Sequence, residues 1–383
     1  MPMATKTARD SCLTRRSALQ CTLAWGLGAF AGSAPAAVPH SAQLLVSWYQ
    51  GLRAWAGLWQ DGRILHRTPL PARAHQLLEL PPAHHGGPRL ALAVARRPGE
   101  YLLRFDPATG RTHTLHRMED DRFLAGHAVF VQTLDTLFTA ETDAASGQGL
   151  VVARDPATLQ RRQEWASGGV GPHALLWEPT GAGQSRPTLL VANGGILNLP
   201  ETGRRKLNLG AMDSNLTRLD AQTGQVLGQW RLDDRFLSLR HLARADDGSV
   251  GIALQAEHPL EAERRQAPAL AVLSAQGLRT APSPAATAPA WDGYAGDIAA
   301  TSERFWVSAP HSGLLLAWSP GGAPLPTLPQ TAVCALHTQH DEVLALGHHH
   351  LRQGPVLHPT PAHTWDNHMG VWNPHAAVPT ARG

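Results

Sequence analysis

Cysteine is almost missing from this chain, which has only three cysteines in 383 residues. Two of them, Cys12 and Cys21, fall within the first 36 residues, so Cys334 stands alone in the remainder. We therefore expect no internal disulfide, and a buried apolar core has to hold the roughly 345 other residues together. A lone cysteine is most often a small buried apolar residue, with a ligand or redox thiol as the alternative.

Several functional motifs are also missing. No cationic run lies beside stacking aromatic residues, and the formal net charge of +3 comes entirely from the first 36 residues. These two observations exclude nucleic acid as an expected partner. The chain has no Gly-x-Ser-x-Gly motif, no Cys-x-x-Cys-His haem attachment and no phosphate-binding glycine loop. We therefore favour a binding or accessory protein over an enzyme.

The start of the chain has the pattern of an export signal. Thr14-Arg15-Arg16-Ser17 precedes an apolar segment at residues 19–31, and Ala34-Pro35-Ala36 follows as a small-residue cleavage site. We predict a twin-arginine signal peptide over residues 1–36, a periplasmic location, and a single domain over residues 37–383. The apolar segment is interrupted by glycines and is shorter than the ~20 apolar residues of a membrane-spanning helix. We therefore expect no membrane span after cleavage, with an uncleaved tether as the alternative.

A polar residue stands directly before a short apolar run at six places in the chain. The six positions are His75, His127, His173, His241, Asp297 and Cys334. They are separated by 37 to 68 residues. A four-stranded propeller blade needs ~40–50 residues, so the two longest intervals would contain insertions. Read as repeats of one unit, the six positions predict an all-β β-propeller whose inner strands begin at one rim.

Turn signals and the two ends of the domain complete the expected architecture. Tight turns are indicated at Asp61-Gly62 and at three further motifs, where hairpins would join the third and fourth strands of a blade. These motifs begin at Asp106, Asp155 and Asp220. Residues 44–70 contain three strand-like runs without a polar first strand, and Trp365-Asp-Asn-His368 supplies the missing one. We predict seven four-stranded blades, closed by strands from the N- and C-terminal ends of the domain.

The polar starts of the inner strands are expected around one mouth of a central channel. Histidine is the commonest protein ligand of zinc, copper and iron, and a carboxylate completes such a site or orients a ring. The candidate ligands of a transition metal or of haem iron are His75, His127, His173, His241, His368 and Asp297. The alternative is that these groups hydrogen-bond strand ends and water around a wet channel.

Loops at the same mouth carry the candidate ligand-binding residues. These residues are Glu141, Asp143, Asn193, Arg204, Lys206, Asn208 and Arg240. The cationic groups suit a carboxylate or phosphate ligand, such as a siderophore or citrate complex, and the alternative is a solvated loop. Proton transfer between His127 and Glu141 would instead fit a metal-dependent or redox enzyme. A third alternative is a rigid protein-interaction scaffold anchored by tryptophans.

A set of short motifs extends over nearly the whole mature chain. The motifs are Arg73-Ala-His75, Ala95-Arg-Arg-Pro-Gly99, Gly126-His-Ala-Val-Phe130, Glu141-Thr-Asp143, Gly169-Val-Gly-Pro-His173, Val191-Ala-Asn-Gly-Gly-Ile196, Gly203-Arg-Arg-Lys-Leu-Asn208, Arg240-His241 and Trp365-Asp-Asn-His368. Together they resemble a bacterial exported family known as domain of unknown function 1513. The chain departs from the family pattern at Ala174, where a glutamate is usual, and at Leu197-Asn-Leu-Pro200, where Thr-His-Pro is usual.

The resemblance implies a seven-bladed propeller similar to YVTN and quinoprotein-type propellers. Family members look like companions of imelysin-like iron-regulated proteins and cytochrome-peroxidase-like proteins, which implies iron-uptake proteins of the cell envelope as partners. The expected function is therefore that of an exported, monomeric binding or accessory protein in iron or metal homeostasis. Its metal or ligand site is expected at the channel mouth.

Overall fold

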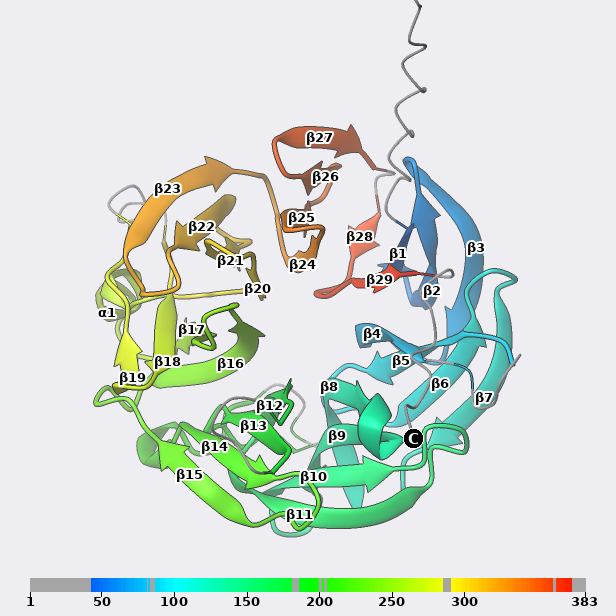
Figure 1. Ribbon diagram of the computed structural model, residues 1–383, viewed down its shortest axis with the longest axis horizontal. Coiled ribbons are helices and arrows are strands. Elements are labelled where there is room, and N and C mark those ends of the chain that lie inside the picture. Colours follow the sequence, from blue (N-terminus) through cyan, green and yellow to red (C-terminus); the bar gives the residue numbers. More distant parts are fainter. Residues whose placement is uncertain are drawn as a thin grey trace, which may run out of the picture. The chain divides into compact units, whose positions relative to one another are not determined.

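The computed structural model describes residues 43–80, 82, 87–180, 186–199, 202, 205–284, 291–360 and 363–373. The predicted signal peptide, residues 1–36, lies outside the described residues. Within the compact unit Ser41–Gly383, the described residues form seven antiparallel sheets. The sheets are arranged as blades around a central axis, with one strand of each nearest the axis (Figure 1). The prediction of an all-β, seven-bladed propeller is confirmed.

The first four blades come from both ends of the described chain and from its first half. From the axis outward, the first blade contains β28 (Thr364–Trp365) and β29 (Gly370–Trp372), then β1 (Gln43–Gln50), β2 (Arg53–Gln60) and β3 (Arg63–Leu70). The second contains β4 (Ala74–Leu80), β5 (Leu90–Ala95), β6 (Tyr101–Asp106) and β7 (Arg111–Arg117). The third contains β8 (Arg122–Val131), β9 (Thr136–Asp143), β10 (Gln148–Arg154) and β11 (Arg161–Val170). The fourth contains β12 (Pro172–Glu178), β13 (Thr188–Asn193), β14 (Asn215–Asp220) and β15 (Val226–Trp230).

Three more blades follow in chain order. The fifth contains β16 (Leu237–Arg244), β17 (Val250–Ala256), β18 (Leu270–Ser274) and β19 (Gly277–Thr280). The sixth contains β20 (Ile298–Ala300), β21 (Phe305–Ala309), β22 (Leu314–Trp318) and β23 (Pro324–Pro329). The seventh contains β24 (Ala335–Gln339), β25 (Glu342–Leu346), β26 (His350–Gln353) and β27 (Val356–Pro359). Short helical turns occur at η1 (Gln132–Leu134), η3 (Leu209–Ala211) and α1 (Glu261–Gln266). None of the helices in the described ranges has the length and apolar character needed to cross a bilayer.

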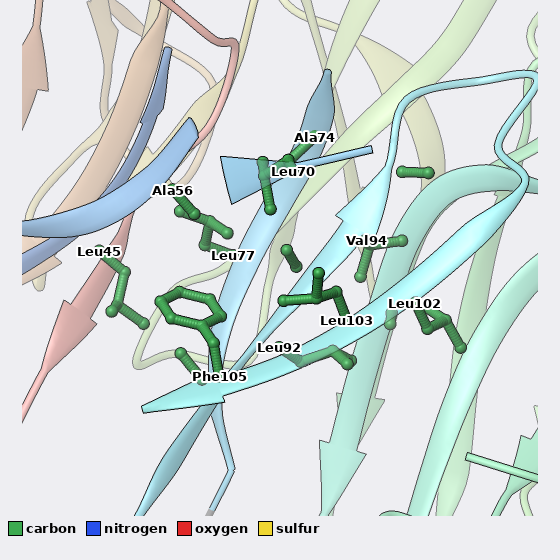
Figure 2. Packing of buried hydrophobic residues seen from close by; sticks show 14 of the residues in the cluster. Leu45, Ala56, Leu70, Ala74, Leu77, Leu92, Val94, Leu102, Leu103 and Phe105 are labelled. Atoms are coloured by element: carbon green, nitrogen blue, oxygen red, sulfur yellow. The ribbon is translucent and has the colours of Figure 1, made fainter. Parts of the chain in front are cut away.

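The core lies between neighbouring blades. Strand β5, whose sequence is LALAVA, is buried at every position, as expected for a strand covered on both faces. Leu45 of β1, Leu77 of β4 and Phe105 of β6 belong to one buried cluster, which joins the first blade to the second (Figure 2). Each such leucine contributes roughly 1.5–3 kcal/mol by leaving water. This packing fixes the blades relative to one another and so positions the inner strands.

The predicted hairpin turns are found where expected. The turns at Asp61-Gly62, Asp106, Asp155 and Asp220 each join the third and fourth strands of a blade. Asp106 is representative: its Oδ1 accepts a hydrogen bond of 2.8 Å from the N–H of Ala108, and Gly110 follows with φ of +75°. A short carboxylate that bonds its own turn, followed by a glycine in the left-handed region, makes this hairpin favourable.

Both ends of the described chain close the ring through the first blade. Strands β28 and β29 pair with β1, with Trp365 opposite Trp48 and Gly370 opposite Leu45. His368 belongs to the connection between β28 and β29, and Figure 1 shows this connection reaching from the first blade toward the axis. The prediction that the segment from Trp365 to His368 completes the first blade is confirmed.

Candidate metal centre

Each of the seven blades places one polar residue at an equivalent position near the axis. Five are histidines, followed by one aspartate and one cysteine in ring order. They are His368, His75, His127, His173, His241, Asp297 and Cys334, in or next to the inner strands of blades one to seven. The repeat recognised in the sequence therefore forms a ring in space. His75 and His368 are neighbours in this ring although they lie near opposite ends of the domain sequence.

Four further blades carry a histidine on the inner strand. In each of them the strand pairing departs from regular register next to that histidine. Register shifts occur in β4 between Ala74 and Gln76 and in β8 between Leu124 and Ala128. Similar shifts occur in β12, between residues 172 and 175, and in β16, between residues 239 and 241. A bulge turns a side chain out of the alternating pattern of a strand. We attribute the inward direction of these histidines to this local departure.

Four of the imidazole rings form a square, and the fifth lies over its middle. Taken in the order His75, His173, His241 and His368, neighbouring rings have centroids 4.6–5.3 Å apart. One diagonal of the square, from His75 to His241, is 6.3 Å, and the other diagonal pair makes no ring contact among the described residues. The ring of His127 is 4.7–5.1 Å from all four others. The five rings therefore form a square pyramid with His127 at its apex.

These spacings match the coordination of a single ion. With metal–nitrogen bonds of about 2.1 Å, ring centroids would lie about 4.6 Å apart for ligands at right angles and about 6.5 Å apart for opposite ligands. The candidate ligand atoms of His75, His127 and His173 lie within 4.8 Å of one another, as do those of His127, His241 and His368. His127 belongs to both triads, so the candidate donor atoms form two overlapping groups of three, and a single ion would need the two groups to draw together.

Every ring offers a nitrogen that the protein leaves unused. The buried ring nitrogens without a hydrogen-bond partner among the described residues are both nitrogens of His75, Nε2 of His127, Nδ1 of His173, Nδ1 of His241 and Nε2 of His368. Buried polar atoms are normally hydrogen-bonded, and leaving one unsatisfied costs about 1–3 kcal/mol. One such atom from each of the five rings would suit an ion that accepts five lone pairs.

The electrostatic surroundings keep most of these rings neutral. Burial lowers the pKa of His75, His127, His173 and His241 well below the ordinary histidine value, because it disfavours the charged form. Repulsion from neighbouring imidazoles and from arginines adds to this effect. A neutral imidazole has the free lone pair that a metal requires. The four rings are therefore available as ligands at neutral pH.

Asp297 orients the fifth ring from outside the pyramid. Its Oδ2 accepts a hydrogen bond from Nδ1 of His368 at 2.9 Å. The carboxylate is itself held by the N–H groups of Ile298, at 2.8 Å from Oδ1, and of Leu336, at 2.9 Å from Oδ2. A proton fixed on Nδ1 leaves Nε2 of His368 as the ligand atom, which is the usual role of a carboxylate behind a metal-binding histidine. Asp297 is thus placed to support a ligand rather than to act as one.

Gly126 is required by the packing of two histidines. It precedes His127 and has φ of +109°, which side chains with a Cβ rarely adopt. A Cβ built at this position would lie 2.4 Å from Cδ2 of His75. The close approach of the chain at Gly126 therefore lets the rings of His75 and His127 meet.

The histidine cluster borders two cavities. We call the first, of about 370 Å³, the arginine cavity; Arg96, Arg97 and Arg240 line it together with His75, His173 and His241. The second, of about 310 Å³, is lined by His127, His241, His368 and mainly apolar side chains. His75 and His173 line the arginine cavity and not the second one, whereas His127 and His368 line the second cavity and not the arginine cavity.

Comparison with known proteins places the chain in a family. A family model matches residues 68–372, which is most of the chain. The chain belongs to the family described as protein of unknown function (DUF1513). The resemblance recognised in the short motifs is therefore confirmed. None of the curated proteins compared with this DUF1513 protein matches it.

Solved structures similar to this DUF1513 protein share its fold. The Dos1 propeller superposes with a TM-score of 0.50 at 9% identity, covering 85% of this chain and 86% of that one. The crystal structure of BBS1N in complex with ARL6DN gives a TM-score of 0.51 at 11% identity, covering 81% and 86% of the two chains. At such low identity the likeness concerns the fold alone.

Two of the candidate ligand-binding residues line the arginine cavity of this DUF1513 protein. They are Lys206, which pairs with Glu257, and Arg240, whose Nε donates to Oε1 of Gln255 at 3.0 Å. The loop residues Ile196 and Asn198 line the same cavity, so the long β13–β14 connection does reach the histidines. Arg204 lies outside the described residues.

The remaining candidate ligand-binding residues have structural partners. Glu141 is fully buried and accepts hydrogen bonds from Nε and Nη2 of Arg154, at 2.8 and 3.1 Å. Asp143 closes a turn by accepting from the N–H and hydroxyl of Ser146. Neither Glu141 nor Asp143 lines the two cavities beside the histidines, and Glu141 pairs with Arg154, so the geometry gives no support to proton transfer between His127 and Glu141.

The two asparagines also stabilise local structure. Asn193 donates from Nδ2 to the carbonyl of Ser167 at 2.9 Å and accepts from the Ser167 hydroxyl at 2.7 Å. Asn208 accepts from the N–H of Leu197 at 2.7 Å and donates to the carbonyl of Gly195 at 2.9 Å. Asn193 therefore ties β13 to β11, and Asn208 clamps the two ends of the loop that carries Lys206. The contacts of both side chains are thus with neighbouring parts of the chain.

The motif Ala95-Arg-Arg-Pro-Gly99 was not assigned a functional role from the sequence. Arg96 and Arg97 follow β5, the second strand of its blade, and that strand ends on the side where β4 begins at His75. The same topology that grouped the histidines could have placed these arginines at the mouth.

Cys334 completes the ring of polar residues. Burial, and after it the nearby Asp297 carboxylate, raises the pKa of the Cys334 thiol to about 12. The thiol is therefore protonated at neutral pH.

Proposed function

We propose that this DUF1513 protein binds one divalent transition-metal ion between its five axial histidines. The observation that carries the proposal is the square pyramid of imidazoles, in which each ring has a buried nitrogen without a partner among the described residues. The spacings fit metal–imidazole bonds, and the Asp297–His368 pair supplies the orienting contact that metal-binding histidines usually have.

The arrangement favours ions that accept five or six nitrogen ligands. Copper(II), nickel(II) and iron(II) bind imidazole and take square-pyramidal or octahedral shells, whereas zinc in structural sites takes four tetrahedral ligands. Haem fits poorly, because its porphyrin would need the four positions around the iron where His75, His173, His241 and His368 already lie. We therefore propose an ion rather than haem.

We further propose that the protein is exported and acts in metal homeostasis, as a binding or accessory protein of the cell envelope. The twin-arginine pattern in residues 1–36 supports export. A buried site built from neutral ligands suits retention of a metal ion, since its ligands need not lose protons at neutral pH. Detection of the cleaved protein in a periplasmic fraction would support this location, and its retention in the cytoplasm would contradict it.

Metal analysis of three proteins tests the binding proposal. We expect purified wild-type protein to hold about one equivalent of a transition ion after incubation with copper(II), nickel(II) or iron(II) and gel filtration. Replacing His127, His173 and His241 by alanine together should abolish this retention. The matched control replaces His348, His349 and His350 by alanine, because these three exposed histidines of the β25–β26 hairpin can bind metal adventitiously.

The two triple variants separate the proposed site from surface binding. The proposal requires the control variant to retain the full equivalent of metal. It is overturned if wild-type protein retains no ion, or if the axial variant retains as much as the wild type. Loss of metal only in the control variant would assign the binding to the exposed histidines instead.

A further inference from the structure

The arginine cavity adjoins the histidine cluster, and His127, the apex of the pyramid, is not among the residues that line it. His75, His173 and His241 line it, together with three guanidinium groups. Arg240 is only 5% exposed, so its charge is held inside the protein next to the histidines.

A metal ion would increase the positive charge of this region. The five ligands are imidazoles, and the carboxylate of Asp297 lies behind His368. Within the described lining of the arginine cavity, the acidic side chains are already paired: Glu257 with Lys206, and Asp292 with Nδ1 of His311 at 2.6 Å. A divalent ion beside these arginines would add to the positive charge around the cavity, and this favours the binding of an anion there.

We infer that the arginine cavity binds a small carboxylate anion, one oxygen of which takes the metal position opposite His127. This inference rests on the proposed function, because the anion bridges the ion and the arginines. Carboxylate oxygens coordinate transition ions and accept paired hydrogen bonds from a guanidinium, so one group satisfies both partners. The cavity volume of about 370 Å³ fits a molecule of a few carbon atoms.

The position of Arg240 is built into the fold. Gln255 accepts from Nε of Arg240 and donates from Nε2 to the carbonyl of Ala295 at 3.0 Å, which fixes the guanidinium plane. On the other side, a Cβ at Gly194 would lie 2.9 Å from Nη1 of Arg240, so the loop passes against the arginine. Held between β17 and the β13–β14 loop, Arg240 is a preorganised contact for an anion at the metal.

Succinate is a suitable probe because it carries carboxylates but chelates metal ions weakly. We would load the protein with one equivalent of copper(II), confirm the stoichiometry by elemental analysis, and titrate with succinate by calorimetry while recording the copper spectrum. We expect succinate to bind the loaded protein at least about tenfold more tightly than the metal-free protein and to shift the spectrum. Succinamide, which has the same shape without the charges, should not bind.

Variants locate the anion. Arg97→Gln combined with Arg240→Gln should weaken succinate binding at least about tenfold while the protein still holds one copper ion. Arg304→Gln removes a charge outside the cavity and serves as the control, with unchanged succinate binding expected. Copper retention without tighter succinate binding, or equal binding by the double variant, overturns the anion site and leaves the proposed metal function standing. A protein that retains no copper overturns both.

Discussion

Nδ1 of His368 donates to Oδ2 of Asp297 at 2.9 Å, which links the closing segment of the first blade to the sixth blade. The contact joins a residue from the end of the described chain to a carboxylate that is fixed by two backbone N–H groups. The same contact therefore helps to close the ring and orients a candidate metal ligand. This coupling brings polar residues of separate blades together near the axis.

Replacing Asp297 by asparagine should weaken metal binding. The amide cannot accept from both backbone N–H groups and from His368 in the same way, so the ring loses its fixed tautomer. We expect the affinity for copper(II) to fall about 10–100-fold, measured by competition with a chromophoric chelator. Asp341→Asn is the matched control, because Asp341 also accepts from a backbone N–H, that of Ser302, but lies on an exposed hairpin. Equal affinities for the two variants would contradict the role of Asp297.

Gly126→Ala should displace His75 and strain the backbone. The new Cβ would stand 2.4 Å from the imidazole and force an unfavourable φ, so we expect loss of metal affinity and about 1–3 kcal/mol of stability. Gly277→Ala imposes a similar φ, +98°, at a position with nothing within 4 Å. The control should lose stability but keep its metal affinity. Normal metal binding by Gly126→Ala would show that His75 does not need this close approach.

The stability of the metal-free protein should fall in mild acid. His75, His127, His173 and His241 have lowered pKa values in the folded protein, and these return to the ordinary value on unfolding. Below about pH 6.5 the unfolded chain therefore binds protons that the folded chain does not. Each such histidine removes about 1.4 kcal/mol of unfolding free energy per pH unit in the range below that value.

Urea unfolding at pH 7, 6 and 5 measures this dependence. A variant with His173→Asn and His241→Asn should show a shallower decrease, since two of the titrating groups are gone. A wild-type protein as stable at pH 5 as at pH 7, or an equal slope in the variant, would show that the buried histidines are not held neutral.

Cys334 should resist alkylation in the folded protein. With a pKa of about 12, its thiol forms very little thiolate at pH 8. We expect iodoacetamide to modify it about a thousandfold more slowly than in urea, where the ordinary cysteine pKa returns. A chain starting at residue 37 contains no other cysteine, so the mass shift is unambiguous. Comparable rates in the two states would contradict the burial of this thiol in its protonated form.

Much of this fold could be predicted because a propeller repeats one simple unit. The polar residues before short apolar runs identified the inner strands, and the Asp-led turns identified the hairpins. Topology then brought His75, His127, His173 and His241 to the axis without any knowledge of side-chain contacts. His368 was reached by the same reasoning, since the first blade lacked an inner strand.

The roles of the other polar residues depend on contacts that the sequence does not reveal. Glu141 and Asn193 are both at the ends of second strands, but their side chains turn into the blades, toward Arg154 and Ser167. The apical position of His127 follows from a local bulge and from Gly126, neither of which a strand pattern predicts. Arg96 and Arg97 could have been found, because they follow a second strand at the same rim.

X-ray absorption spectroscopy of the protein loaded with one equivalent of copper(II) tests the central claim most directly. We expect four or five imidazole nitrogens at about 2.1 Å from the ion, with the signal lost when His127, His173 and His241 are replaced and retained when residues 348–350 are replaced. A shell with fewer than three imidazoles, or one that survives replacement of the axial histidines, would contradict the account.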